Sequence, residues 1–212
     1  GATSALATAD PIGTQTTQSH AILTDPEWHG GDYLAAGTSP DVGLGIARRI
    51  AHLTYRSEDE LAIRFGRDEQ DGEAPLAAAS VVDAYAPGHR YAVQSYLDHA
   101  AEKLVHRFDA GSYVALTDAM TTHDLGRDRG GVAAALSQIT VPMVVSGIDS
   151  DRLYPLRLQQ QIVDAVPYAG ALRVIESPFG HDAFLLESEA VAAQLREAFT
   201  LSAARRERTR CA

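Results

Sequence analysis

The sequence has 212 residues, is 45% hydrophobic and carries a formal net charge of −10. This length allows one full hydrophobic core or a large domain with a small subdomain, and the acidic balance argues against nucleic-acid binding, which needs a basic face. The single cysteine, Cys211, excludes an intrachain disulfide, and no apolar run is long enough for a membrane span, so a cytoplasmic protein without membrane contact is predicted.

Residues 1–9 have the composition of a core strand that ends and continues into a loop. A mainly helical block is predicted over 10–130, and its first helix starts at Asp10, which precedes a proline. A second helix, "DVGLGIARRIAHLTYR", has an apolar stripe at the spacing of a helix face: Val42, Ile46, Ile50 and Leu53. Arg48, His52 and Tyr55 lie on its opposite, polar face.

Ser57 and Glu60 form a capping box that predicts a short third helix, "EDELAIRF". Residues 66–89 are rich in Asp, Glu, Gly and Ala, and they predict a loose insertion. Helical patterns return over 90–108 and 112–124.

From residue 131 the pattern changes to alternating helices and strands, with apolar strands predicted at "VPMVVSG" and "ALRVIE". Strands separated by helices at this spacing are typical of a parallel sheet with crossover helices. This α/β region is predicted over 131–201, and a polar tail follows over 202–212. Because a stable parallel sheet needs more than two strands, most of the sheet is expected to lie outside these residues.

Candidate catalytic residues follow the two predicted strands, where α/β sheets place their ligand sites. Asp149 and Asp151 come directly after the first strand, and His181 and Asp182 come after the second. An acid followed by a histidine in this order matches the second and third members of a Ser–Asp–His triad. Read separately, Asp151 could instead cap the next helix, and His181 could be a solvated surface residue.

The nucleophile of such a triad is missing from the sequence. The elbow motif Gly-x-Ser-x-Gly does not occur, and neither Ser112, Ser146 nor Cys211 has the strand-to-helix context that the motif requires. We therefore expect the nucleophile, and the strand that carries it, to precede residue 1.

The segments "IGTQTTQ", "DPEWHGGDY", "GLGIARRIAHLTYR", "HDLGRDRGG", "GIDSDRLYP" and "FGHDAFLLE" resemble the homoserine O-acetyltransferase family, in family order and closest to its actinobacterial type. The resemblance implies the C-terminal portion of an α/β-hydrolase fold with a helical lid insertion, without the N-terminal sheet and the nucleophile elbow. It implies transfer of acetyl from acetyl-CoA to the hydroxyl of L-homoserine through an acyl-serine intermediate, in methionine biosynthesis.

The resemblance also implies roles for individual residues. Asp151 would be the triad acid and His181 the base, while Arg48, Tyr55 and Asp182 would contact the amino-acid substrate. These residue types suit a zwitterion, because an arginine binds a carboxylate through two parallel hydrogen bonds and an aspartate binds an ammonium. Acetyl-CoA would act as a co-substrate, with no bound cofactor, and a homodimer would form through the lid.

Other functions remain open at this stage. The chain could be a non-catalytic fragment that binds a partner, and residues 1–212 alone are expected to be inactive. An esterase, or a serine or homoserine succinyltransferase, would share the fold. No metal site is predicted, because His99, His106 and Asp109 do not complete a ligand motif.

Overall fold

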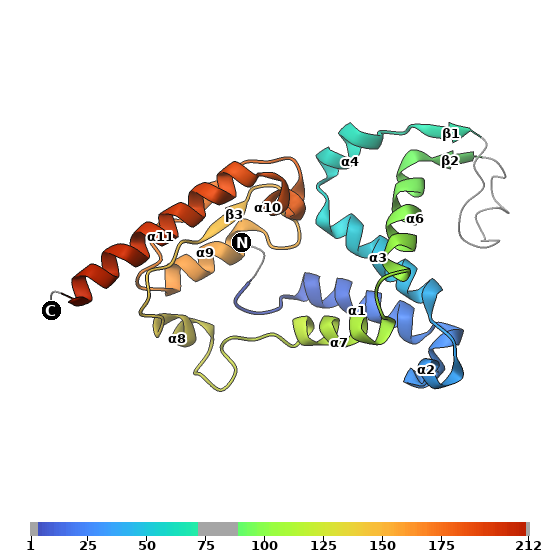
Figure 1. Ribbon diagram of the computed structural model, residues 1–212, viewed down its shortest axis with the longest axis horizontal. Helices are drawn as coiled ribbons and strands as arrows, with labels where there is room; N and C mark the ends of the chain where they lie inside the picture. The colour runs from blue at the N-terminus through green and yellow to red at the C-terminus, as the bar shows by residue number, and fades with distance from the viewer. Residues whose placement is uncertain (1–3, 72–88, 211–212) are drawn as a thin grey trace. The chain divides into compact units, whose positions relative to one another are not determined.

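The computed structural model describes residues 4–71 and 89–210, and its chain divides into two compact units (Figure 1). The core unit comprises Gly1–Thr8, Tyr55–Ser57 and His123–Ala212. The helical unit comprises Ala9–Thr54 and Glu58–Thr122. The helical unit ends at residue 122 and leaves out the tripeptide Tyr55–Ser57, whereas the lid was predicted over 10–130; that this unit acts as a lid stays a prediction.

The core unit is built on a parallel pair of short strands. Strand β3 (Ser146–Ile148) pairs with β4 (Arg173–Ile175), with Gly147 opposite Val174. The surrounding helices are α8 (Val132–Ser137), α9 (Leu156–Ala165), η2 (Gly180–Asp182), α10 (Ala183–Leu186) and α11 (Ser188–Arg210). Each predicted strand is therefore present, but shorter than its apolar run, because only these residues find a ladder partner among the described residues.

Two buried clusters hold the core unit together. One packs Leu136 against Val145 and against Ile162 of the amphipathic helix α9. The other packs Ile148 and Ile175, the last residues of the two strands, against Ala183 at the start of α10. The second cluster fixes the carboxyl ends of both strands, which is where the chain leaves the sheet to form the candidate site.

The helical unit contains α1 (Ala9–Leu23), η1 (Pro26–Gly31), α2 (Tyr33–Ala36), α3 (Asp41–Tyr55), α4 (Glu58–Phe65), α6 (Ala92–Val105) and α7 (Ala110–Thr121). Helices α1 and α7 lie side by side (Figure 1). The unit's core gathers Ile22, Leu44, Ala47, Leu104 and Ala110.

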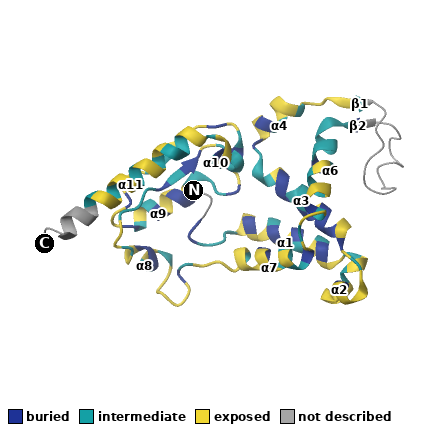
Figure 2. Ribbon diagram, in the orientation of Figure 1, coloured by how far each residue is buried: buried dark blue, intermediate teal, exposed yellow. Residues whose placement is uncertain are grey.

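The buried face of α3 differs from the prediction. Val42, Ile46 and Leu53 of the predicted apolar stripe are 68%, 45% and 42% exposed, and the buried residues are instead Gly43, Leu44, Gly45, Ala47, Ala51 and His52 (Figure 2). The reason is steric: α3 meets α1 through small residues, so closely that a Cβ on Gly43 would lie 2.4 Å from the carbonyl oxygen of Ala21. The small residues of α3 therefore face α1, and the bulky residues Val42, Ile46 and Leu53 of the predicted stripe are left exposed.

Three further predictions change in detail. Residues 4–8 form no strand, and only an isolated antiparallel bridge joins Leu6 to Asp124. The ends of the predicted loose insertion are paired, since β1 (Glu69–Asp71) runs antiparallel to β2 (His89–Tyr91), while 72–88 lie outside the described residues. The predicted tail over 202–212 continues α11 as far as Arg210.

Within the described part of the chain, no helix has both the length and the apolar character needed to cross a membrane.

Candidate functional site

Asp151 lies in the loop that follows β3, and its side chain is almost completely buried. Its Oδ1 accepts hydrogen bonds from the backbone N–H groups of Leu153 and Tyr154, at 2.8 and 2.9 Å. Asp151 therefore caps a tight turn that precedes α9, while the N-cap position of α9 is Pro155. The turn uses only Oδ1 of Asp151, so capping and a bond to a histidine, the two roles considered for this residue, do not exclude each other.

His181 lies in the loop after β4, and its Nδ1 is 2.8 Å from the second carboxylate oxygen of Asp151, Oδ2. The histidine side chain is only 12% exposed, so it is not a solvated surface residue. An Nδ1–H that donates to a carboxylate leaves Nε2 with a free lone pair, and this is the tautomer that a general base requires.

Aromatic rings surround the imidazole on several sides. The ring centroids of Tyr55, Tyr154 and Phe184 lie 5.7, 5.4 and 5.4 Å from that of His181. Burial raises the pKa of the Tyr154 phenol, and the neighbouring Tyr55 and Asp151 raise this pKa further. Tyr154 therefore stays neutral around pH 7 and adds no charge next to the histidine.

The loop after β3 that carries Asp151 (the acid loop) and the loop after β4 that carries His181 (the base loop) are joined through Asp149, Ser150 and Asp151. The Oδ1 of Asp149 accepts the N–H of Ser177 at 3.0 Å. The hydroxyl of Ser150 donates to the carbonyl oxygen of Ser177 and accepts the N–H of Gly180 at 3.0 Å. Together with Asp151 and His181, these bonds fix the base loop against the acid loop over its whole length. Sequence reasoning singled out Asp149 only as an acid after a strand and missed Ser150, whose position inside "DSD" was the available signal.

Of the predicted substrate contacts, Tyr55 and Asp182 lie at this site. The Tyr55 ring neighbours His181, and the Asp182 carboxylate is 3.2 Å from the guanidinium of Arg56. Sequence reasoning missed Arg56, the residue after Tyr55 at the end of the predicted second helix. Arg48 is half-buried on α3 in the helical unit, and its role stays a prediction.

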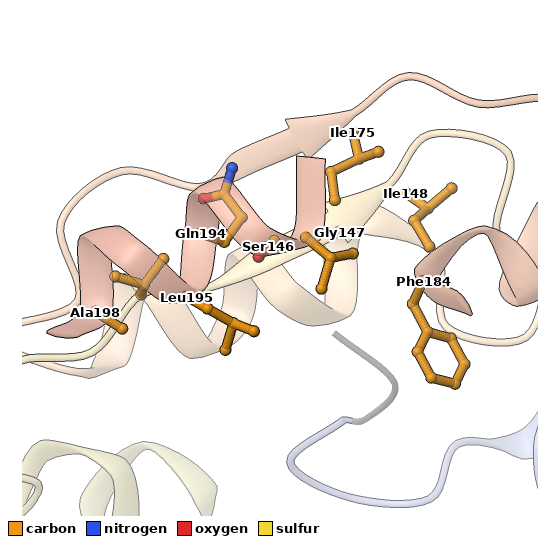
Figure 3. Close-up of a pocket in the computed structure, with 10 residues that line it drawn as sticks. Ser146, Gly147, Ile148, Ile175, Phe184, Gln194, Leu195 and Ala198 are labelled. Atoms are coloured by element: carbon orange, nitrogen blue, oxygen red, sulfur yellow. The ribbon is translucent and has the colours of Figure 1, made fainter. Parts of the chain in front are cut away.

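A separate cavity of about 240 Å³ lies beside the strands and includes neither Asp151 nor His181 (Figure 3). Figure 3 shows residues of β3 together with Phe184 of α10 and Leu195 of α11 around it. Its lining is mainly apolar and contains no ionisable side chain.

No group of three or more His, Cys, Asp or Glu side chains that could hold a metal ion occurs among residues 4–71 and 89–210.

An acid and a histidine at the carboxyl ends of adjacent parallel strands, in this chain order, are typical of the α/β-hydrolase fold. Solved structures agree: the homoserine O-acetyltransferase from Bacillus anthracis matches with a TM-score of 0.77 at 20% identity, over 93% of this chain and 51% of that chain. An acetylester hydrolase from Corynebacterium glutamicum matches with a TM-score of 0.66 at 22% identity, over 93% and 51%. The chain thus has the α/β-hydrolase fold, over about half of the length of these proteins.

No family model matches the sequence. Curated relatives show which members of the α/β-hydrolase class the chain is similar to. The chain is 57% identical over 201 residues to the homoserine O-acetyltransferase of Mycobacterium tuberculosis (strain ATCC 25177 / H37Ra), covering 95% of this chain and 50% of the relative. It is 56% identical over 205 residues to that of Nocardia farcinica (strain IFM 10152), covering 97% and 51%. The chain is therefore a homologue of the homoserine O-acetyltransferases, as its motifs predict, and spans about half the length of the curated relatives it matches.

Proposed function

We propose that the protein containing this chain transfers an acetyl group from acetyl-CoA to the hydroxyl of L-homoserine. The observation that carries the proposal is the bond between Asp151 Oδ2 and His181 Nδ1, at 2.8 Å, in a chain 57% identical to proteins named for this reaction.

In the proposed reaction His181 acts twice as a general base. In the first half-reaction its Nε2 takes the proton of a serine hydroxyl that attacks the thioester of acetyl-CoA, and the imidazolium returns the proton to the departing CoA thiolate. In the second, Nε2 takes the proton of the homoserine hydroxyl that attacks the acyl-serine, and the serine leaves protonated. Asp151 stabilises the imidazolium in both steps.

The proposed serine is not supplied by an elbow motif within the 212 residues. Since the chain spans about half the length of its relatives, we place the nucleophile and the oxyanion hole in a part of the protein outside residues 1–212. The Asp151–His181 pair then represents the acid and base of a triad whose third member lies elsewhere.

The proposed substrate contacts divide between the two charges of homoserine. Arg48 would bind the carboxylate, and Asp182, beside the base, would bind the ammonium. Asp182 already pairs with Arg56 in a partly buried position, so the ammonium would share its carboxylate with this arginine. The Tyr55 ring would form part of the wall next to His181.

We also propose a homodimer formed through the helical unit. Val42, Ile46 and Leu53 expose a row of apolar side chains on one face of α3. Such a row is costly to leave in water, and a second copy would cover it. Methionine biosynthesis as the pathway and the cytoplasm as the location belong to the same proposal.

The test is an assay of the full-length protein with purified substrates. We expect release of CoA from acetyl-CoA only when L-homoserine is present, with O-acetylhomoserine identified by mass spectrometry. Succinyl-CoA as donor, and L-serine or water as acceptor, distinguish the succinyltransferase and esterase alternatives. Equal turnover without any amino acid would replace the proposal with an esterase. Residues 1–212 expressed alone are expected to be inactive, and activity there would overturn the placement of the nucleophile.

A further inference from the structure

The tripeptide Tyr55–Ser57 spans the end of α3 and the start of the connection to α4, yet it groups with the core unit. Its contacts are with the loop that carries His181. In the proposed reaction Arg56 takes part only through its pair with Asp182 and Ser57 takes no part, so the contacts of the tripeptide with this loop need another explanation.

The closest approach is at Gly180, the residue before the base. Gly180 has φ of +62°, a left-handed conformation that favours glycine. A Cβ at this position would lie 2.6 Å from the carbonyl oxygen of Tyr55 and 2.7 Å from the amide nitrogen of Ser57. The backbone of the tripeptide therefore lies directly against the backbone of the base loop, and only glycine fits between them.

Polar contacts fix the same two segments on either side of Gly180. The Ser57 hydroxyl donates to the carbonyl oxygen of Pro178, and Ser57 is 5% exposed. The Arg56 guanidinium lies 3.2 Å from the carboxylate of Asp182, with both side chains mostly buried. The loop is thus bonded two residues before Gly180 and two residues after it.

We propose that Tyr55–Ser57 positions the catalytic base, with Ser57 and Arg56 as positioning residues whose contacts with Pro178 and Asp182 add to the bonds that Asp149 and Ser150 make to the His181 loop. This inference rests on the proposed function for its catalytic consequence. Neither residue touches the reacting atoms. They act through the direction in which Nε2 points, because His181 is bonded to Asp151 only through Nδ1.

The effect on turnover follows from how sharply proton transfer depends on geometry. A displacement of about 1 Å in a reacting group can cost about a hundredfold in rate. Removing one of two polar contacts should displace the loop by less, so we expect Ser57→Ala to lower kcat about tenfold in both half-reactions. The KM for homoserine should change little, because Ser57 is not a proposed substrate contact.

The test uses the full-length protein and compares Ser57→Ala with Ser57→Thr, which keeps the hydroxyl. Ser137→Ala is the matched control, because the Ser137 hydroxyl also donates to a backbone carbonyl of the core unit, that of Ala134, at 2.8 Å. Two readouts are needed: kcat and KM with homoserine, and the ¹⁵N NMR shifts of the His181 imidazole without substrate, which report the ring tautomer. We expect Ser57→Ala to move the imidazole resonances away from those of wild type, because the ring would meet Asp151 in a changed geometry, with Ser57→Thr and Ser137→Ala close to wild type.

Arg56 is tested in the same way, with Arg56→Met against Arg56→Lys. The control is Arg173→Met, which removes another arginine–carboxylate pair of the core unit, that with Glu197. Arg56→Met should disturb the imidazole spectrum and, through Asp182, also raise the KM for homoserine. Arg56→Lys should change the imidazole spectrum and the KM for homoserine less than Arg56→Met does, because lysine keeps the positive charge.

The outcomes separate the two proposals. If wild type fails to acetylate homoserine but Ser57→Ala still alters the imidazole spectrum, the proposed function is wrong and the positioning role stands. If wild type is active and Ser57→Ala matches Ser137→Ala in kcat and in spectrum, the positioning role is overturned. A loss of kcat with an unchanged spectrum would also overturn it, because the loop would not have moved.

Discussion

Asp151 uses its two carboxylate oxygens for different purposes: Oδ1 holds the turn at Leu153 and Tyr154, and Oδ2 holds the imidazole of His181. The turn thereby fixes the direction from which the carboxylate meets the histidine. A substitution that keeps the oxygen holding the turn, such as Asp151→Asn, should consequently affect chemistry more than folding.

We predict that His181→Ala in the full-length protein lowers kcat about 10⁴-fold or more, because the proposed base is lost. Asp151→Asn should cost about as much, since an amide at Oδ2 would favour the wrong imidazole tautomer. Steady-state kinetics with acetyl-CoA and homoserine measure both, and circular dichroism checks the fold. Either variant retaining more than about a tenth of the activity would contradict the triad assignment.

Arg48→Lys should impair the second half-reaction far more than the first. The substitution keeps the charge but loses the two parallel hydrogen bonds that an arginine makes to a carboxylate. Rapid-quench measurement of enzyme acylation by acetyl-CoA isolates the first step, and transfer to homoserine reports the second. Equal damage to both steps would indicate that Arg48 has a structural role.

Two glycines of α3 should respond to alanine in opposite directions. At Gly43 the new Cβ would lie 2.4 Å from Ala21 O and 2.7 Å from Ile22 Cα, so Gly43→Ala should lower the free energy of unfolding by about 1–3 kcal/mol. At Gly45 the new Cβ would meet the Cβ of Ala101 at 3.6 Å, an ordinary contact. Gly45→Ala should therefore stabilise the protein by about 0.5–1 kcal/mol, because alanine favours the helix. Urea unfolding compares them, and equal effects would show that the α1–α3 crossing is not close.

The Tyr33–Asp109 bond should make stability depend on pH at both extremes. The Tyr33 hydroxyl donates to Asp109 Oδ1 at 2.5 Å, which lowers the pKa of Asp109 below 3.8 and raises that of Tyr33 above 10.0. A lowered carboxyl pKa stabilises the fold above the unfolded-state value, and this contribution is lost as pH falls through the lower, folded-state value. A raised phenol pKa acts in the opposite sense, so its contribution is lost as pH rises through the folded-state value.

Tyr33→Phe should hence lower the free energy of unfolding most between about pH 5 and 9, with the difference from wild type narrowing towards either extreme. Tyr168→Phe is the control, because Tyr168 is 60% exposed. A Tyr33→Phe effect that stays constant from pH 3 to pH 7 would contradict the role of the bond.

The apolar row on α3 gives a test of the proposed dimer. Ile46→Asp should convert the full-length protein to a monomer, because a buried, unpaired carboxylate would be costly at an interface. The same change at Ile63 on α4, which is 81% exposed, should leave the dimer intact. Sedimentation at micromolar concentration measures the oligomeric state of wild type and both variants, and a monomeric wild type would rule the dimer out.

Sequence reasoning predicted that Asp151 and His181 lie together, and the structure places them within hydrogen-bond distance, because the signal for each residue is local. Asp151 and His181 each follow an apolar run, and parallel strands bring such ends together whatever the rest of the chain does. The helix "EDELAIRF" was equally readable, because its capping residues lie beside it and α4 spans Glu58–Phe65.

What the sequence could not show depends on close packing between distant segments. The buried face of α3 was assigned to bulky residues, while the helix crossing selects Gly43 and Ala47. Ser57 was read as a helix cap, yet its hydroxyl also reaches Pro178, a residue 121 positions away. Such contacts leave no periodic pattern, so no spacing rule would have found them.

The bonds that Asp149, Ser150 and Asp151 make to the loop over 177–181 also restrict how these loops can change in length. Three adjacent residues bond in order to Ser177, Gly180 and His181, so inserting or deleting one residue between the bonded positions of either loop would shift the pairs that follow it out of alignment. Single substitutions leave this alignment in place, but length changes in the two loops would have to occur together. Protein engineers who wish to move this acid–base pair into another α/β scaffold should therefore transfer both loops as a single block.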